Sequence, residues 1–529
     1  MSDGKKLNTR ASGIISIAVM CSRVLGLVRE VLFNSLFGAA SMGLFILAFR
    51  IPNLLRDLFA EGALSTAFVT VFSQRIKREG KKSAWELASK MMTLVAVFMS
   101  LVTLLGILFS RQLVNLLARS FPPEDLAFTV LLTQVMYPFI LLVSLAALVM
   151  GMLNSRNIFT APAMASSFFN IGSIAGGVVF GWLIDPSFGR GALLGLALGT
   201  LLGGLLQLVI QFPSLRRAGF SFRPNFRWRD HGIRKILELM VPSVVAASAV
   251  QVNVLINTGF AAHVGEAAVT WLNSAFRLMQ LPIGVFGVAI ATVTLPVVSR
   301  IAADADTSLF GPTLGRAMRL AVFLTLPAAV GLWFLADPII GLIYEHGKFL
   351  SFDTQQTGFA LRFYAMGLVS YSCIKILAPA FYAINRKWTP MLVSFVSIAL
   401  NVLLNYIFIF HMNLGHRGLA LSTSICATLN FGILYFLMLG PAGTLESRRF
   451  LLAVARCALA SLVLGAVCWA GIHFTPRLFP RPAFWQGGMM LFVTMGAASL
   501  IYLAACLLLR VEETQDALRI IQRKIRRKA

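Results

Sequence analysis

The run AFRIPNLLRDLFAEGALS at residues 48–65 places charged side chains inside an otherwise apolar part of the chain. Its opening triplet, Ala48-Phe49-Arg50, recurs 227 residues later as Ala275-Phe276-Arg277. Further matches keep nearly the same offset: Tyr137 with Tyr364, Pro162 with Pro390, and Arg190-Gly191 with Arg417-Gly418. Collinear matches at one spacing indicate an internal repeat, and a generic similarity among apolar helices is the alternative.

The composition is that of a membrane protein. Of the 529 residues, 58% are hydrophobic and only 13% are charged, and the mean hydropathy is +0.80. Soluble domains carry about 25% charged residues, so a soluble enzyme is not expected. A helix that crosses a bilayer needs about 20 apolar residues. Fourteen such stretches can be counted: 13–36, 40–60, 86–109, 127–153, 158–184, 190–212, 236–262, 267–297, 315–336, 357–384, 388–411, 417–440, 450–474 and 483–510.

We therefore expect an all-α polytopic membrane protein with 14 transmembrane helices. The repeat offset contains six stretches, an even number, so the two halves have the same orientation. This arrangement predicts two six-helix lobes as a parallel repeat, followed by two C-terminal helices. The expected segments are an N-terminal lobe at 1–214, a basic cytoplasmic linker at 215–235, a C-terminal lobe at 236–440, the last two spans at 441–510 and a basic cytoplasmic tail at 511–529.

The basic residues predict the orientation of the chain. Lys and Arg number 46 against 21 Asp and Glu, a formal net charge of +25. The strongly basic segments follow the second, sixth, tenth and twelfth stretches and the last one. Segments that follow odd-numbered stretches are balanced or acidic. By the positive-inside rule, both termini are cytoplasmic. Because orientation explains much of the positive charge, we expect no nucleic-acid partner.

Ionisable side chains inside the apolar stretches are the candidate functional residues. Such groups are costly in a bilayer and usually face a cavity or a partner. Four stretches supply seven basic groups against three acids: Arg23, Arg29, Arg50, Arg56, Arg277, Arg362 and Lys375 against Glu30, Asp57 and Glu61. A cavity with surplus arginine attracts an anion, and a planar guanidinium can bind a phosphate through two parallel hydrogen bonds.

Snorkelling to the interface or an internal salt bridge is the structural alternative for each of these groups. This alternative explains Arg50, Asp57 and Arg362 as well as a function does. The surplus of positive charge favours a function for the remaining arginines, which are Arg23, Arg29, Arg56 and Arg277.

Two prolines point to backbone that lines a cavity. A proline inside a helix removes a hydrogen-bond donor and bends the helix. Such backbone is tolerated at membrane depth where it faces protein or a cavity. We therefore expect Pro52, its neighbour Asn53, and Pro282 to form hinge or cavity positions.

No pattern in the sequence indicates catalysis, so we expect a transporter and not an enzyme. The chain has no H-E-x-x-H, Walker A or G-x-S-x-G motif where it could act. The six cysteines lie in apolar surroundings without C-x-x-C spacing, and we interpret them as small core residues. We expect no catalytic residue, no metal and no cofactor. A membrane-embedded transferase or phosphatase would need paired acids or a histidine in an outward loop, where only isolated candidates such as Asp337 and Glu345 occur.

Four stretches resemble the MurJ/MviN family, the bacterial lipid II flippases of the multidrug/oligosaccharidyl-lipid/polysaccharide exporter superfamily. These stretches are residues 22–30, 49–65, 276–287 and 375–382, and the similarity runs through about residues 10–440. The resemblance implies two six-helix lobes, a central cationic cavity, and a groove for a polyprenyl tail along the last two helices. It also implies that Arg23, Arg29, Arg56 and Arg277 are the family's essential cavity arginines, and that Glu61 is the acid of a conserved motif.

The chain departs from the family at two positions. Relatives often have an acid near Gly43 and another at Phe276, so a gating or proton-coupling role does not carry over to these positions. The eleventh and twelfth stretches contain no Asp or Glu, so we do not expect coupling to sodium.

The function implied by the resemblance is that of a lipid II flippase in the bacterial inner membrane. It would move undecaprenyl-pyrophosphate-linked peptidoglycan precursor to the outer leaflet by alternating access, with Arg23, Arg29, Arg56, Arg277, Glu61 and Lys375 at the substrate. The alternatives are an exporter of another polyprenyl-linked saccharide or of small cationic compounds, and a non-transporting scaffold. The expected partners of a monomeric flippase are lipid II, membrane lipids and cell-wall synthesis enzymes.

Overall fold

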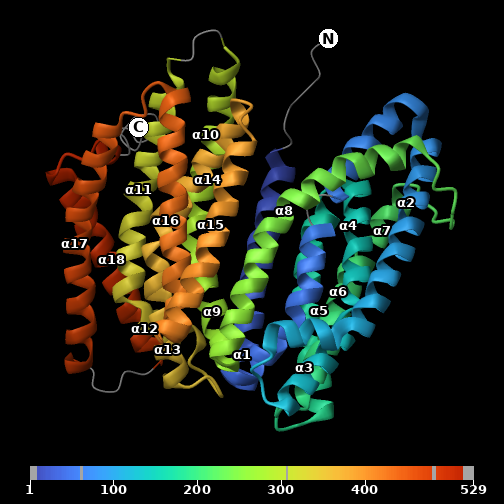
Figure 1. Cartoon of the computed structure of the whole chain (residues 1–529), viewed down its shortest axis with the longest axis horizontal. Coiled ribbons are helices and arrows are strands. Elements are labelled where there is room, and N and C mark those ends of the chain that lie inside the picture. Colours follow the sequence, from blue (N-terminus) through green and yellow to red (C-terminus); the bar gives the residue numbers. More distant parts are fainter. Residues whose placement is uncertain (1–8, 60–63, 305–307, 479–483, 516–529) are drawn as a thin grey trace. The chain divides into compact units, whose positions relative to one another are not determined.

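The computed structural model describes residues 9–59, 64–304, 308–478 and 484–515, and the regular secondary structure of these residues is helical throughout (Figure 1). Helices are expected in lipid because each satisfies its own backbone hydrogen bonds. The contacts divide the chain into two compact units. Unit 1 comprises Met1–Thr270 with His346–Phe349, and unit 2 comprises Trp271–Glu345 with Leu350–Ala529.

Unit 1 contains eight helices among its described residues. They are α1 (Thr9–Phe59), α2 (Ser65–Ala118), α3 (Pro123–Met136), α4 (Phe139–Ser155), α5 (Thr160–Ile184), α6 (Ala192–Val209), α7 (Phe212–Arg217) and α8 (His231–Val264). Two of them bend at a glycine, α1 at Gly38 (φ 75°) and α2 at Gly80 (φ 85°), because positive φ is open to glycine without steric strain.

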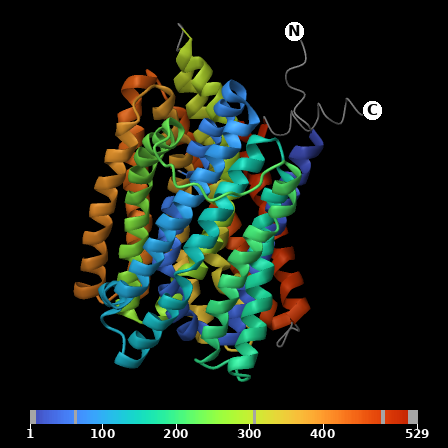
Figure 2. The ribbon, with the colours of Figure 1, turned by 90° about the vertical axis from the view of Figure 1, so that its right-hand side faces the viewer.

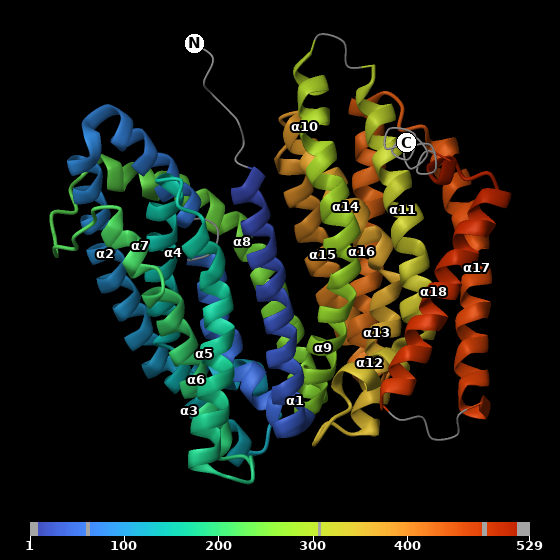
Figure 3. The same cartoon turned by 180° about the vertical axis from the view of Figure 1, so that it is seen from behind.

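Unit 2 begins within α9 (Glu266–Pro282) and continues with a π-helix, η2 (Ile283–Val288). Its other elements, seen from behind in Figure 3, are α10 (Ala289–Ala303), α11 (Phe310–Phe334), α12 (Ala336–Tyr344), α13 (Ser351–Met366), α14 (Leu368–Ala383), α15 (Trp388–Tyr406), η3 (Ile407–His411), α16 (Gly415–Ala442), α17 (Ser447–Leu478) and α18 (Phe484–Leu508).

The described helices account for most of the predicted spans. Eleven are long and apolar enough to cross a membrane, or twelve if the bent pair α13–α14 forms one span. The first two predicted spans both lie in α1 and are divided at Gly38, and the seventh corresponds to α8, which is outside these eleven. An all-helical multi-pass protein is confirmed, and the number of fourteen stays a prediction.

Helices α5 and α6 pack backbone to backbone. A Cβ atom on Gly199 would overlap the backbone at Gly177, and one on Gly195 would overlap the backbone at Gly181. Small residues allow membrane helices to approach this closely, which increases van der Waals contact where the hydrophobic effect gives no help. The two helices therefore form one tightly packed pair within unit 1.

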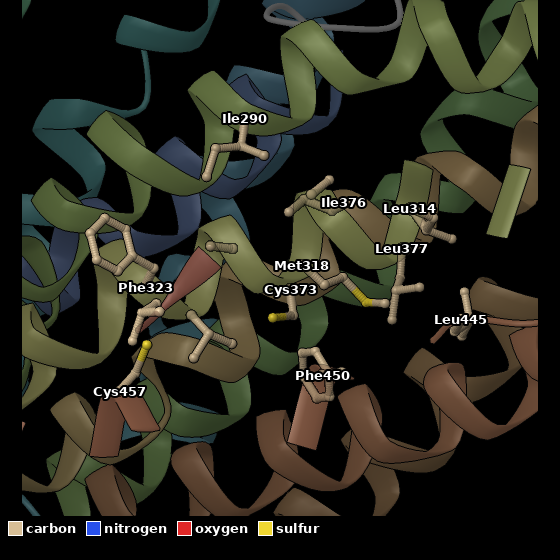
Figure 4. Close-up of a cluster of buried hydrophobic side chains, with 14 of the residues drawn as sticks. Ile290, Leu314, Met318, Phe323, Cys373, Ile376, Leu377, Leu445, Phe450 and Cys457 are labelled. Carbon is tan, nitrogen blue, oxygen red and sulfur yellow. The ribbon is translucent and has the colours of Figure 1, made fainter. Parts of the chain in front are cut away.

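The core of unit 2 joins the C-terminal helices to α11. Figure 4 shows Leu314, Met318 and Phe323 of α11 in one cluster with Phe450 and Cys457 of α17. From α18, the Tyr502 hydroxyl donates a hydrogen bond of 2.8 Å to the carbonyl oxygen of Phe323. The last two helices are thus a packed part of unit 2.

Arg319 ties the same three helices together by charge. Its side chain is 6% exposed, and it lies 2.6 Å from Glu446 before α17 and 3.0 Å from Glu513 after α18. A buried guanidinium needs paired, hydrogen-bonded carboxylates, and here the two come from opposite ends of the α17–α18 pair.

In unit 1, the linker between α7 and α8 is fixed to α2 at three points. The ring of Phe220 packs 5.2 Å from that of Trp85, and the backbone N–H of Asn225 donates to Thr93 Oγ1 at 3.1 Å. Asp230 then accepts from Arg75 at 2.7 Å and from Lys90 at 2.9 Å. Figure 2 shows this linker (green) crossing unit 1.

Asp230 also begins α8, because its side chain caps the backbone N–H of Gly232 at 2.8 Å. Burial raises the pKa of Asp230, but the hydrogen bonds from Arg75, Lys90 and Gly232 outweigh burial and hold it at about 2. The carboxylate is therefore charged at any physiological pH. The contacts of α8 with α1 and α2 place this helix in unit 1, whereas the predicted lobe boundary assigns residues 236–262 to the C-terminal lobe.

Replacing Asp230 with Asn should lower the melting temperature of the purified protein, because Arg75 and Lys90 lose their shared carboxylate. Loss of a hydrogen-bonded charged partner costs about 1–3 kcal/mol. Since the folded pKa of about 2 lies below the ordinary 3.8, this stabilisation is fully present above about pH 4 and is lost as the pH falls toward 2.

Thermal unfolding in detergent between pH 2 and pH 7 measures this effect. The control is Glu238→Gln, which breaks the exposed pair of Arg234 and Glu238 and should cost about 0.5 kcal/mol or less. Equal shifts for the two variants would contradict the anchoring role of Asp230.

Candidate functional site

The first two candidate arginines lie on the part of α1 that packs against α5. Arg29 is half-buried, and its guanidinium carbon lies 5.0 Å from the centroid of the Phe169 ring. One residue further along α5, Asn170 Nδ2 donates to the backbone oxygen of Ser22 at 3.1 Å. Arg23, next to Ser22, is exposed. The cation–π contact holds Arg29 in an orientation set by α5.

Arg56 lies near the other end of α1, beside Asp57. Its Nη2 is 2.8 Å from Asp57 Oδ1, and the two side chains are 22% and 23% exposed. The second oxygen of Asp57 accepts from Asn53 at 3.4 Å and from Gln251 of α8 at 3.3 Å. One carboxylate thus orients a candidate arginine and connects α1 to α8.

The bend of α1 does not lie at Pro52, one of the hinge or cavity positions predicted from the sequence. Pro52 is buried within α1, and the non-helical dihedral angles of this helix occur at Gly38. Asn53 is half-buried and faces Asp57. Glu61 lies outside the described residues. A cavity role for these positions stays a prediction.

The remaining candidates belong to unit 2. Arg277 is half-buried on α9, and Pro282 ends this helix where the backbone changes to the π-helix η2. Single π turns inside helices are frequent at functional sites. Gly287 of η2 lies so close to Ser372 of α14 that a Cβ atom would be 3.1 Å from the serine hydroxyl. Lys375, one turn further along α14, is exposed.

Arg362 fits the structural alternative. Its Nη2 lies 2.6 Å from Asp337 Oδ2, its Nε donates to the backbone oxygen of Trp333 at 3.3 Å, and its guanidinium carbon is 5.3 Å from the Phe359 ring. These contacts fix Arg362 between α11, α12 and α13. These contacts from three helices are those of a structural residue.

Two residues of the candidate site, Phe169 and Gln251, are missing from the sequence-based predictions. Phe169 offers no signal, because one more phenylalanine in an apolar stretch is unremarkable as a sequence feature. Gln251 does carry a signal, since it is a polar residue in the middle of the stretch 236–262. Phe276, where relatives often have an acid, packs edge to face on Tyr364 with ring centroids 5.3 Å apart. An aromatic contact therefore holds the side chain that precedes Arg277.

Gly43 is another departure with a physical cause. A Cβ atom at this position would overlap the backbone carbonyl of Glu266, at the start of α9. The close approach of α1 to this carbonyl requires glycine, so no acidic side chain fits here.

Comparison with known proteins agrees with the resemblance seen in the sequence. The family described as "Lipid II flippase MurJ" matches residues 33–485. The probable lipid II flippase MurJ of Vibrio cholerae is 35% identical over 467 residues, which cover 86% of this chain and 88% of the relative. The lipid II flippase MurJ of Burkholderia cenocepacia is 35% identical over 474 residues, which cover 88% and 90%.

Solved structures give the same relationship. One described as "Lipid II flippase MurJ, inward closed conformation" aligns with a TM-score of 0.76 at 27% identity, covering 94% of this chain and 98% of that one. An inward-facing multidrug transporter of the MATE family aligns with a TM-score of 0.67 at 17% identity, covering 83% and 99%. The second similarity concerns the fold alone.

Replacing Gly43 with Ala should destabilise the protein, because the new methyl group must displace the backbone at Glu266. Overpacking of this kind costs about 1–3 kcal/mol. Gly331→Ala in α11 is the matched control, since a Cβ atom there meets nothing within 4 Å and alanine favours the helix. Melting temperatures of the two variants should shift in opposite directions or differ clearly, and an unchanged value for Gly43→Ala would contradict the close contact.

Proposed function

This chain belongs to the MurJ family of lipid II flippases, and we propose that it moves undecaprenyl-pyrophosphate-linked peptidoglycan precursor from the inner to the outer leaflet of the cytoplasmic membrane. The observation that carries the proposal is the family match along nearly the whole chain, together with the arginines kept inside its apolar helices. The curated relatives are named as flippases, which are transporters and not enzymes.

The proposed substrate contact is between guanidinium groups and the pyrophosphate. Arginine binds phosphate through two parallel, charge-assisted hydrogen bonds, and it keeps its charge at any physiological pH. In the proposal, Arg23, Arg29 and Arg56 of unit 1 and Arg277 of unit 2 replace the water around the pyrophosphate. Lys375 and Glu61 are proposed to complete the site.

Alternating access is the proposed mode of transport. The two six-helix lobes would open in turn toward each side of the membrane, with Pro52, Asn53 and Pro282 as hinge or cavity positions. The polyprenyl tail would stay in lipid beside α17 and α18. The parallel repeat supports two lobes that move against each other, and the packing of α17 and α18 on α11 supports a separate role for these two helices.

Arg277→Ala and Arg56→Ala should each abolish complementation of a strain depleted of its own flippase. The variant proteins should still insert stably, and their free energy of unfolding should change by about 1 kcal/mol or less. The loss of one bidentate contact removes two charge-assisted hydrogen bonds, each contributing about 1.5–3 kcal/mol. Arg362→Ala is the control that should still complement, because Arg362 is bound by Asp337, the carbonyl of Trp333 and the ring of Phe359, contacts that join helices within unit 2.

Transport is measured directly by asking how much lipid-linked precursor an externally added enzyme can reach. Depletion of the protein should leave the precursor inside and out of reach, and the wild-type gene should restore access. Full activity of the Arg277→Ala variant would remove the proposed site. Accumulation of a different polyprenyl-linked saccharide would leave the chemistry of the site in place and change the substrate.

Collapse of the membrane potential alone should slow transport. A charge that crosses the membrane gains or loses about 2.3 kcal/mol per 100 mV, and both the bound pyrophosphate and the emptied cationic site carry charge. A potassium ionophore that removes the potential is compared with an exchanger that removes only the pH gradient. Transport that is unaffected by the first treatment would exclude coupling to the potential.

A further inference from the structure

The linker of unit 1 presents positive charge that its neighbours leave uncompensated. Between its anchors on α2, the side chains of Arg223, Arg227 and Arg229 are exposed. Arg216 and Arg217, at the end of α7, are exposed as well. No acidic residue occurs between positions 216 and 229, and Asp230 is already bound by Arg75 and Lys90.

The bend of α2 adds to the same surface. Around Gly80, the side chains of Lys77, Arg78, Lys81 and Lys82 are exposed, and the contact of Arg75 with Asp230 connects this bend to the linker. We call these nine residues the cationic collar: Lys77, Arg78, Lys81, Lys82, Arg216, Arg217, Arg223, Arg227 and Arg229. Both parts belong to unit 1.

The neighbouring acids are engaged with basic residues outside the collar. Glu79 lies 2.9 Å from Arg75, Glu86 lies 2.9 Å from Lys90, and Glu238 lies 2.9 Å from Arg234. The collar therefore keeps a strong positive field. Fields of this kind select an anionic partner.

Two phenylalanines alternate with the collar arginines. Phe222 is 47% exposed and Phe226 is 65% exposed, next to Arg223 and Arg227. The linker is held in this course by its anchors, so the rings do not fold back into unit 1. Large exposed aromatic side chains interleaved with arginine are typical of segments that lie in the interface of a bilayer.

The position of the collar along the helices supports a membrane partner. The apolar helix segments Ser65–Ala118 and Ala192–Arg217 are both candidate spans. Four collar residues lie at the bend of the first, two lie at the end of the second, and three lie in the linker that follows it. Side chains at such positions meet lipid headgroups. The basic collar also lies on the side that the positive-inside rule predicts to be cytoplasmic.

We propose that the cationic collar binds acidic phospholipid headgroups of the adjacent leaflet, with Phe222 and Phe226 inserted at the boundary between headgroups and acyl chains. The arginines bind the lipid phosphates, and the rings bury apolar surface beside them. The contact anchors the linker end of unit 1 to the bilayer surface. It is separate from the proposed substrate site and does not depend on lipid II transport.

The test uses the full chain with one reporter in the linker. Cys21, the exposed cysteine among the six, is replaced by serine, and Ser221→Cys carries an environment-sensitive fluorophore. The detergent-purified protein is titrated with mixed micelles that contain phosphatidylglycerol or phosphatidylcholine. At low salt, phosphatidylglycerol should shift the fluorophore emission to shorter wavelength, and this shift should disappear at high salt. Phosphatidylcholine should give no shift.

Charge and apolar insertion are separated by two variants. The triple variant R223Q/R227Q/R229Q should weaken binding of phosphatidylglycerol by roughly 100-fold, since each arginine near a charged surface contributes about 1 kcal/mol. F222S/F226S should weaken binding but keep its dependence on salt. The matched control R386Q/K387Q/R448Q removes three exposed charges from unit 2 and should bind as the wild type does.

Three results would overturn the proposal. One is equal weakening by the triple variant and the matched control, which would mean that net charge alone matters. Another is the same emission shift with inorganic phosphate at equal concentration, which would identify a free-anion site. The third is an unchanged affinity in the triple variant when its melting temperature equals that of the wild type.

Discussion

A guanidinium group in an apolar bundle has to be held by its surroundings, because lipid offers it neither water nor counterions. This chain holds its intramembrane arginines in different ways. Arg319 and Arg362 are bound by carboxylates, whereas Arg29 lies over the face of Phe169. Arg56 shares Asp57 with the amide groups of Asn53 and Gln251. The partners of these arginines thus range from paired carboxylates to the face of an aromatic ring.

The two kinds of partner have different energetic consequences. A buried ion pair is stable only while both members are present, so Arg319 acts as a fixed connection among α11, α17 and α18. The ion pair of Arg56 is with the neighbouring residue of the same helix, and its side chains are 22% and 23% exposed, so solvent screens it more than it screens the buried pairs of Arg319.

The sequence predicts helical spans well because length and hydropathy alone determine them. It also indicates the basic candidates, since an arginine in an apolar stretch is conspicuous, but their role at a substrate stays a prediction. The break between its first two predicted spans, at residues 37–39, coincides with the bend of α1 at Gly38. The bend expected at Pro52 does not coincide with the non-helical dihedral angles of α1, and the approach of Lys348 at Gly38 depends on tertiary packing. The π-helix after Pro282 and the cation–π contact of Arg29 depend on neighbouring helices in the same way.

The two departures from the family, at Gly43 and Phe276, are explained by contacts in the folded protein. The sequence shows that Gly43 and Phe276 stand where relatives often have acids, but not what fills the space. The carbonyl of Glu266 occupies it at Gly43, and the ring of Phe276, packed against Tyr364, occupies it at position 276. Both are long-range contacts, and local propensity says nothing about them.

The pairing of Arg319 with Glu513 has a practical consequence for work with this protein. Glu513 follows α18, yet its carboxylate pairs with a buried side chain of α11. A purification tag or fluorescent fusion joined directly after Leu508 would discard that carboxylate, so that Arg319 would keep Glu446 and lose its link to the chain after α18. Fusions joined beyond Gln515 keep it, and so keep the terminal hairpin seated.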